Sequence, residues 1–182
     1  MLAESVRWCS ERFGRVVATC HTEQSAARLR AIGSNVVAVQ ADWSRPEEWW
    51  RTVGAILGDA PVALAVAWIH SAAGHLHEQV GAAVHEDGLF VRVRGHATAT
   101  PERGELAAWI DAPDVPHALS DRRERHIVLG WHDDDGGRWL SSDEIGCAVA
   151  QLVERWLADP TESPVAWVGS VRPWERRPPG WG

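Results

Sequence analysis

The stretch MLAESVRWCSERFGRVVATCHT, residues 1–22, sets the order of elements from which the fold follows. Its first part carries apolar residues at the spacing of an amphipathic helix: Leu2, Val6, Cys9 and Phe13. Residues 15–22 follow as an apolar run that is typical of a buried strand. The chain therefore opens with a helix that leads directly into a strand.

The same alternation continues to the end of the chain. Helices are predicted over residues 23–33, 44–58, 72–88 and 141–159, and strands over residues 35–42, 61–71, 89–95, 125–132 and 164–171. Residues 98–125 are predicted to be an irregular connection, and a small hairpin is predicted near residues 130–140. Because parallel strands need long crossovers, this order predicts a Rossmann-like α/β fold, a three-layer sandwich with a mostly parallel sheet.

The starts of two helices can be assigned to particular residues. Ser44 is the predicted N-cap of one helix, and Ser141 with Glu144 forms a capping box at another. The buried stripe of the second helix is predicted to consist of Ile145, Val149, Leu152, Val153 and Trp156.

Composition limits the size and the partners of this fold. The chain has 182 residues, of which 45% are hydrophobic, so we expect a single domain over residues 1–182. Its net charge of -7 and the absence of a basic run disfavour nucleic acid and anionic membranes as partners. The sequence shows no signal peptide, long apolar run or lipidation motif, and its three cysteines have no paired spacing, so we expect a cytoplasmic protein.

Six segments carry a resemblance to a known family. They are residues 1–22, ADW (41–43), AWIHS (67–71), VRVRG (91–95), VLGWHDDDGGRWLSSDEI (128–145) and VGSVRPWERRP (168–178). In order and spacing they resemble a small bacterial family of short-chain dehydrogenase-like proteins over nearly the whole chain. The resemblance implies a Rossmann fold that binds NAD or NADP.

The resemblance also implies a missing element. In that family the first helix is preceded by a strand and a Gly-Gly-Thr-Gly turn that runs into Met-Leu, which Met1 and Leu2 match. We therefore expect a sheet without its first strand, and favour a truncated gene start, with Met1 an internal residue, over loss of the strand. Strands 15–20 and 62–68 would then lie roughly 10 Å apart. They must pair directly, take a strand from another chain, or leave backbone groups unpaired.

The cofactor is expected at the carboxyl ends of the strands. The positions that the resemblance assigns to it are His21, Thr22, Asp42, Trp43, Trp68, Ile69, His70 and Ser71. An arginine in place of His21 would have indicated NADP, so NAD and NADP both stay open. Asp42 is equally well interpreted as a turn residue that leads a helix, and AWIHS replaces the Asn-Asn-Ala-Gly turn of many relatives.

The catalytic residues of the family are absent. Short-chain dehydrogenases use a tyrosine and a lysine four residues later, and this sequence contains neither residue type. His70 is the nearest candidate acid because histidine titrates near neutral pH, although a histidine satisfied by backbone hydrogen bonds is the alternative. Arg92 and Arg94 point to one face of a strand, where they can meet an anion or pair with acids.

No metal is expected. The histidines at positions 70, 75, 77 and 85 lack the i, i+4 pairing of zinc helices, and the acidic run after His132 lies in a predicted hairpin turn.

Two functions remain open at this point. The first is a divergent short-chain dehydrogenase-like oxidoreductase that uses NAD or NADP on a small molecule, which the polar residues at the strand ends favour. The alternative is a non-catalytic Rossmann-like module that binds a nucleotide or a protein partner, which the absence of tyrosine and lysine favours. A sheet edge, or the C-terminal tail with Trp174 and Trp181, is the expected contact for a partner or a second copy.

Overall fold

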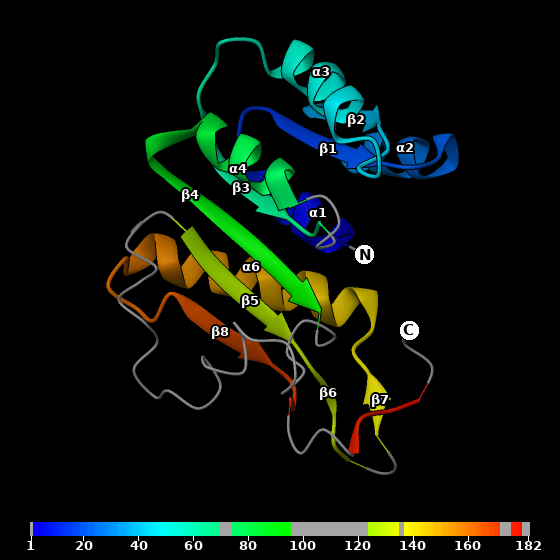
Figure 1. Cartoon of the computed structure of the whole chain (residues 1–182), viewed down its shortest axis with the longest axis vertical. Coiled ribbons are helices and arrows are strands. Elements are labelled where there is room, and N and C mark those ends of the chain that lie inside the picture. The colour runs from blue at the N-terminus through cyan, green and yellow to red at the C-terminus, as the bar shows by residue number, and fades with distance from the viewer. Residues whose placement is uncertain (1, 70–73, 96–123, 135–136, 172–175, 180–182) are drawn as a thin grey trace.

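Two parallel sheets flanked by helices form the computed structural model, which describes residues 2–69, 74–95, 124–134, 137–171 and 176–179 (Figure 1). The elements in chain order are α1 (Ala3–Arg12), β1 (Val16–Cys20), α2 (Glu23–Arg30), β2 (Val36–Gln40), α3 (Pro46–Leu57), β3 (Val62–Ala67), α4 (Gly74–Ala83), β4 (Val84–Gly95), β5 (Glu124–Leu129), β6 (Trp131–His132), β7 (Arg138–Trp139), α6 (Ser142–Ala158) and β8 (Val165–Val168). The predicted α/β class with a mostly parallel sheet is confirmed.

The parallel strands form two sheets. One sheet contains β1 and β2, and the other contains four strands in the order β3-β4-β5-β8. Figure 1 shows β3 and β1 as successive strands across the molecule, yet no ladder joins them within the described residues. Direct pairing, one of the three outcomes expected from the sequence, is therefore excluded for these strands. The predicted hairpin is confirmed by the antiparallel pair of β6 and β7.

The main core lies between α6 and one face of the four-stranded sheet. The five residues of the predicted stripe on α6 are all buried, and they pack against Leu89, Val91, Val93, Ile127 and Leu129 of the sheet. The capping box at the start of α6 is present in both directions. The Glu144 amide donates to Ser141 Oγ at 3.2 Å, and the Ser141 amide donates to the Glu144 carboxylate at 2.8 Å.

Helices pack across the two parallel sheets, which are not joined by hydrogen bonds between their strands within the described residues. On one face, α1 contacts α6 through a hydrogen bond from Ser5 Oγ to the Gly146 carbonyl at 3.1 Å. A Cβ atom at Gly146 would lie 2.8 Å from the Cβ of Glu4, so glycine permits this close helix crossing. On the other face, α3 and α4 share a second core with β2, which includes Val39, Trp49, Val53 and Leu76.

The boundary between α4 and β4 differs from the prediction. The helix predicted over residues 72–88 ends at Ala83, and the residues that follow belong to β4. The register of β3 and β4 shifts there, because Val62 pairs with Val84 whereas Leu64 pairs with Leu89. Burial of Val84, which is 6% exposed, favours the strand over one more helical turn.

Several predictions lie outside the described residues. These are the irregular connection over residues 98–125, apart from its last two positions, and the proposed roles of His70, Ser71, Trp174 and Trp181. Among the helices that the structure describes, none combines the length and apolar character needed to cross a bilayer.

Candidate functional site

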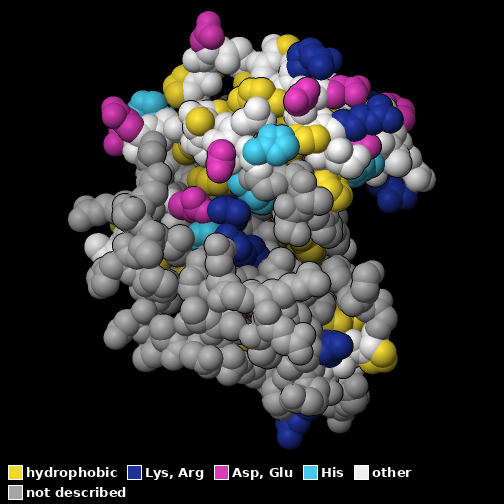
Figure 2. All heavy atoms as spheres, viewed as in Figure 1, with side chains coloured by type: hydrophobic (Ala, Val, Ile, Leu, Met, Phe, Trp, Pro, Cys, Tyr) yellow, Lys and Arg dark blue, Asp and Glu magenta, His cyan; other side chains and the backbone are white. Residues whose placement is uncertain are grey.

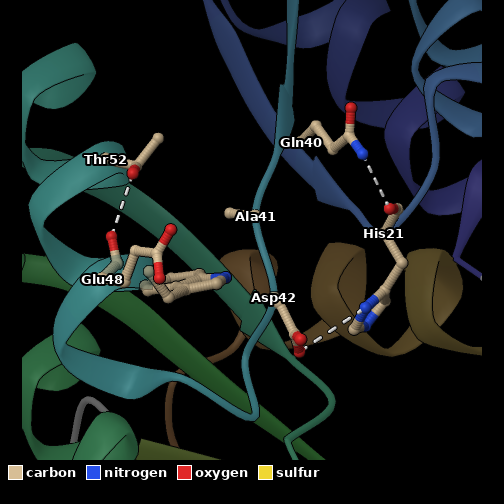
Figure 3. A pocket seen from close by; sticks show the side chains of 7 residues that line it. His21, Gln40, Ala41, Asp42, Glu48 and Thr52 are labelled. Atoms are coloured by element: carbon tan, nitrogen blue, oxygen red, sulfur yellow. Dashed lines mark hydrogen bonds and ion pairs between the residues drawn. The ribbon is translucent and has the colours of Figure 1, made fainter.

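A pocket of about 220 Å³ opens where β1 and β2 end, beside the first turns of α3 (Figure 3). It is lined by His21, Gln40, Ala41, Asp42, Glu48, Trp49 and Thr52. Pockets for whole drug-sized ligands measure roughly 300–1,000 Å³. This pocket therefore suits a fragment of a ligand, such as a nucleobase or a ribose.

Parallel pairing places two of the predicted residues in this pocket. Cys20 and Gln40 are register partners at the ends of β1 and β2, and the Ala41 amide extends their ladder by donating to the Cys20 carbonyl at 2.9 Å. The next side chains, His21 and Asp42, consequently meet at one edge of the sheet. His21 Nδ1 lies 3.7 Å from Asp42 Oδ1 (Figure 3).

Asp42 is held in its ionised form. Its Oδ1 accepts a hydrogen bond from the Ser44 amide at 2.9 Å. Hydrogen bonds from Ser44 lower the pKa of the Asp42 carboxyl, and the charges of His21 and Arg45 lower it further. Ser44 thus belongs to the turn that precedes α3. The N-cap of α3 is Arg45, so the prediction of Ser44 as the N-cap was wrong. Asp42 leads a helix, as one interpretation from the sequence has it, and it also lines a pocket; its role in binding a cofactor stays a prediction.

Aromatic rings border the same pocket. Trp49 on α3 is 8% exposed and lines the pocket, and its ring stacks at 6.2 Å on that of Trp50. The Trp43 ring meets the His21 ring edge to face at 5.9 Å. A flat ligand ring can therefore pack against apolar aromatic surface on the helix side.

The remaining predicted residues lie elsewhere. Thr22 accepts a hydrogen bond from the Ser25 amide at 3.1 Å and so caps α2. Trp68 packs against the core beneath α6, and Ile69 packs among residues of α3 and α4. None of these three side chains lines the pocket.

Five lining residues were not predicted: Gln40, Ala41, Glu48, Trp49 and Thr52. Glu48, Trp49 and Thr52 lie on one face of α3 because they are spaced as one helical turn. In the sequence, that spacing and the position of the helix directly after Asp42 were the features from which these residues could have been predicted. No sequence feature of Gln40, the last residue of a strand, indicated that it lines the pocket.

A second group of titratable side chains lies on the face of the sheet opposite α6. Arg92 donates to Glu124 at 2.8 Å, Glu124 lies 3.1 Å from His126 Nε2, and Arg94 Nε donates to His126 Nδ1 at 3.2 Å. Charged and histidine side chains gather over β4 and β5 in Figure 2. Of the two roles open to Arg92, the structure shows the pairing with an acid.

Burial shifts the titration of this group. Burial alone would raise the pKa of Glu124, but hydrogen bonds from His126 and Arg92 outweigh it and lower that pKa to about 2. Burial lowers the pKa of His126, and it lowers the pKa of His77 on α4 to about 4, with Arg92 adding to the effect. The network is therefore an ionised Arg–Glu pair flanked by neutral histidines at pH 7.

One group of side chains within the described ranges has a spacing that would suit a metal ion. It consists of His85, Glu86 and Asp87, all exposed. The Asp87 amide already donates to His85 Nδ1 at 3.2 Å. We assign no metal to these residues, and the absence of a metal site stays a prediction.

Comparison with known proteins gives matches at the level of structure. No protein-family model matches the chain, and no curated protein matches its sequence. A crystal structure assigned as a betaketoacyl-ACP reductase has a TM-score of 0.60 and 18% identity, covering 92% of this chain and 90% of that one. A short chain dehydrogenase/reductase family protein has a TM-score of 0.59 and 18% identity, covering 91% and 89%.

A third structure, assigned as a short-chain alcohol dehydrogenase from Burkholderia multivorans, has a TM-score of 0.55 and 14% identity, covering 92% of this chain and 90% of that one. At identities this low, the structural similarity establishes the fold alone. The chain therefore has the Rossmann-like fold of the short-chain dehydrogenase/reductase proteins, and the resemblance drawn from its sequence segments is confirmed at that level.

Proposed function

We propose that this protein binds a nicotinamide dinucleotide, NAD or NADP, with the adenosine part in the pocket of His21 and Asp42. We further propose that it acts as an oxidoreductase on a small molecule. The observation that carries the proposal is the ionised Asp42 carboxylate at the carboxyl edge of two parallel strands, in a pocket that Trp49 also lines.

The position of the pocket supports this proposal. In open parallel sheets, ligands bind outside the carboxyl ends of the strands, and an acidic side chain there accepts hydrogen bonds from ribose hydroxyls. The pocket volume of about 220 Å³ accommodates one ring system, which leaves the rest of a dinucleotide to extend along the sheet edge. The solved structures of like fold, described as reductases and dehydrogenases, agree with this choice of ligand.

The proton that accompanies a hydride transfer must come from an unusual donor. The chain has no tyrosine and no lysine, so the usual donor and its activator are both missing. We propose His70, which follows Ile69 at the end of β3, for this role. Its side chain lies outside the described residues.

A non-catalytic binding module is the second candidate function. The absence of tyrosine and lysine favours it directly, because binding requires the pocket and no proton donor. A protein partner or a second copy of the chain would then bind at a sheet edge or at the C-terminal tail. That contact and the oligomeric state stay predictions.

Isothermal titration of the purified protein with NADH and with NADPH tests the binding proposal. We expect saturable binding of at least one dinucleotide, and a loss of about tenfold or more in Asp42→Ala, since a hydrogen bond to a charged group contributes roughly 1.5–3 kcal/mol. Asp59→Ala, which alters an exposed acid outside the pocket lining, is the matched control. Absence of binding by both dinucleotides would overturn the proposal.

Turnover separates the two candidate functions. We expect NADH or NADPH to be oxidised in the presence of a small ketone or aldehyde, and His70→Asn to lower the rate at saturating dinucleotide. Binding without turnover against a broad panel of carbonyl compounds would favour the module.

A further inference from the structure

Two hydrogen-bond donors in the pocket bind carbonyl groups of the protein itself. Gln40 Nε2 donates to the His21 carbonyl at 3.1 Å, and Thr52 Oγ1 donates to the Glu48 carbonyl at 2.9 Å (Figure 3). Phosphate oxygens only accept hydrogen bonds at neutral pH and need such donors. These two groups are therefore partly engaged within the protein, while the second N–H of Gln40 and the His21 ring can still donate to a ligand.

Hydrogen-bond acceptors dominate what remains. The carboxylates of Asp42 and Glu48 both line the pocket, and neither can donate while ionised. Asp42 is kept ionised by the hydrogen bonds from Ser44. Two negative charges favour a ligand group with hydroxyl or amino hydrogens and repel a dianion placed beside them.

A cation beside the pocket pairs with one of its acids. Arg45, the N-cap residue of α3, lies with its NH1 atom 3.5 Å from Glu48 Oε2. An arginine at a helix N-terminus would otherwise suit a phosphate group. Glu48 thus adds negative charge to the pocket and holds the guanidinium that could offset it.

We infer that the pocket selects an adenosine with free ribose hydroxyls and rejects one with a 2′-phosphate, so that the protein takes NAD in preference to NADP. Glu48 is the residue that sets this preference, through its own charge and its hold on Arg45. The inference rests on the proposed function, since it assumes that the adenosine part of a dinucleotide occupies this pocket.

Titration with four ligands tests this inference. They are NADH, NADPH, adenosine 5′-monophosphate and adenosine 2′,5′-bisphosphate, each added to the full chain in a calorimeter. We expect NADH and adenosine 5′-monophosphate to bind about tenfold more tightly than their 2′-phosphorylated counterparts, the effect of roughly one unfavourable charge contact. Equal or tighter binding of the 2′-phosphorylated ligands would overturn the inference and leave the proposed function standing. Failure of all four to bind would overturn the proposed function itself.

Substitution of Glu48 sharpens the test. Glu48→Gln removes one charge and releases Arg45, so we expect the ratio of the NADPH affinity to the NADH affinity to rise about tenfold. Adding Arg45→Gln to this variant should remove most of the gain. Glu47→Gln, which alters the neighbouring acid outside the pocket lining, is the matched control and should leave the ratio of the two affinities unchanged. An unchanged ratio in Glu48→Gln would contradict the role of this residue.

Discussion

The strands β5 and β1 both lie inside the row of strands in Figure 1, yet they differ in burial. In β5 every residue after Glu124 is buried, whereas in β1 only Ala18 is buried and Thr19 is exposed. β5 has a partner strand on each side, β4 and β8, and α6 covers one of its faces. Within the described residues β1 pairs with β2 alone. In these two strands, greater burial accompanies pairing on both edges and cover by α6.

The better buried region and the region that contains the pocket are therefore different parts of the molecule. The large core beneath α6 belongs to the four-stranded sheet, while the pocket belongs to the less buried region of β1, β2 and α3. Segments with few buried apolar contacts open locally at lower free energy than the core. A ligand in the pocket is therefore expected to stabilise β1, β2 and α3, the region that opens at lower free energy.

The largest expected effect tests the core of the four-stranded sheet. Trp156 is 2% exposed, and its Nε1 donates to the Ser163 carbonyl at 3.0 Å. Trp156→Ala should lower the free energy of unfolding by about 3–5 kcal/mol, measured by urea denaturation. The neighbouring Leu157 is 52% exposed, so Leu157→Ala is the control, with an effect of about 0.5 kcal/mol or less. Similar losses of unfolding free energy in the two variants would contradict the role of the core beneath α6.

Amide hydrogen exchange compares the local stability of the two parallel sheets within one sample. Amides of β1 should exchange about 100-fold faster than those of β5, because β1 can open locally whereas β5 opens only with the whole sheet. Saturating NADH should slow exchange in β1 and leave β5 nearly unchanged. Equal protection of β1 and β5 in the free protein would show that the burial difference has no energetic counterpart.

The pH dependence of stability depends on the four-stranded region. Burial lowers the pKa of His77 from 6.5 to about 4 in the folded protein. Between these values the unfolded chain binds a proton that the folded chain does not, so stability falls as the pH falls from 6.5 to 4. His77→Gln should reduce this loss by about 1–3 kcal/mol, measured by urea unfolding at several pH values. The exposed His85→Gln is the control, and an unchanged slope in His77→Gln would exclude His77 as the cause.

Helix caps provide the smallest and most local comparison. Ser141 caps α6 over the main core, and Thr22 caps the short α2 beside β1. Ser141→Ala should lower the free energy of unfolding by about 1 kcal/mol. Thr22→Ala should cost less globally and appear chiefly as faster exchange of the first α2 amides, since this region opens before the core does. A larger global loss from Thr22→Ala than from Ser141→Ala would reverse the proposed order of stability.

The candidate site was only partly predictable. His21 and Asp42 could be placed because each directly follows a recognisable strand, and residues at the carboxyl ends of paired parallel strands lie together. Trp68 and Ile69 also follow a strand, but consecutive side chains point to opposite faces, and each packs into a different core. Glu48 and Thr52 enter the pocket from a helix whose approach to β2 depends on packing.

The sequence by itself determined the alternation of helices and strands, the parallel α/β class and the buried stripe of α6, including its cap by Ser141 and Glu144. These features arise from local spacing of apolar residues and from contacts a few residues apart, which the order of amino acids specifies directly. The packing of the whole chain was needed to show that β1 and β3 do not pair and that Asp42 and Glu48 line the same pocket. It also decided that Arg92 is bound to Glu124. Such contacts join residues on separate elements, so they depend on strand register and helix packing over the whole molecule.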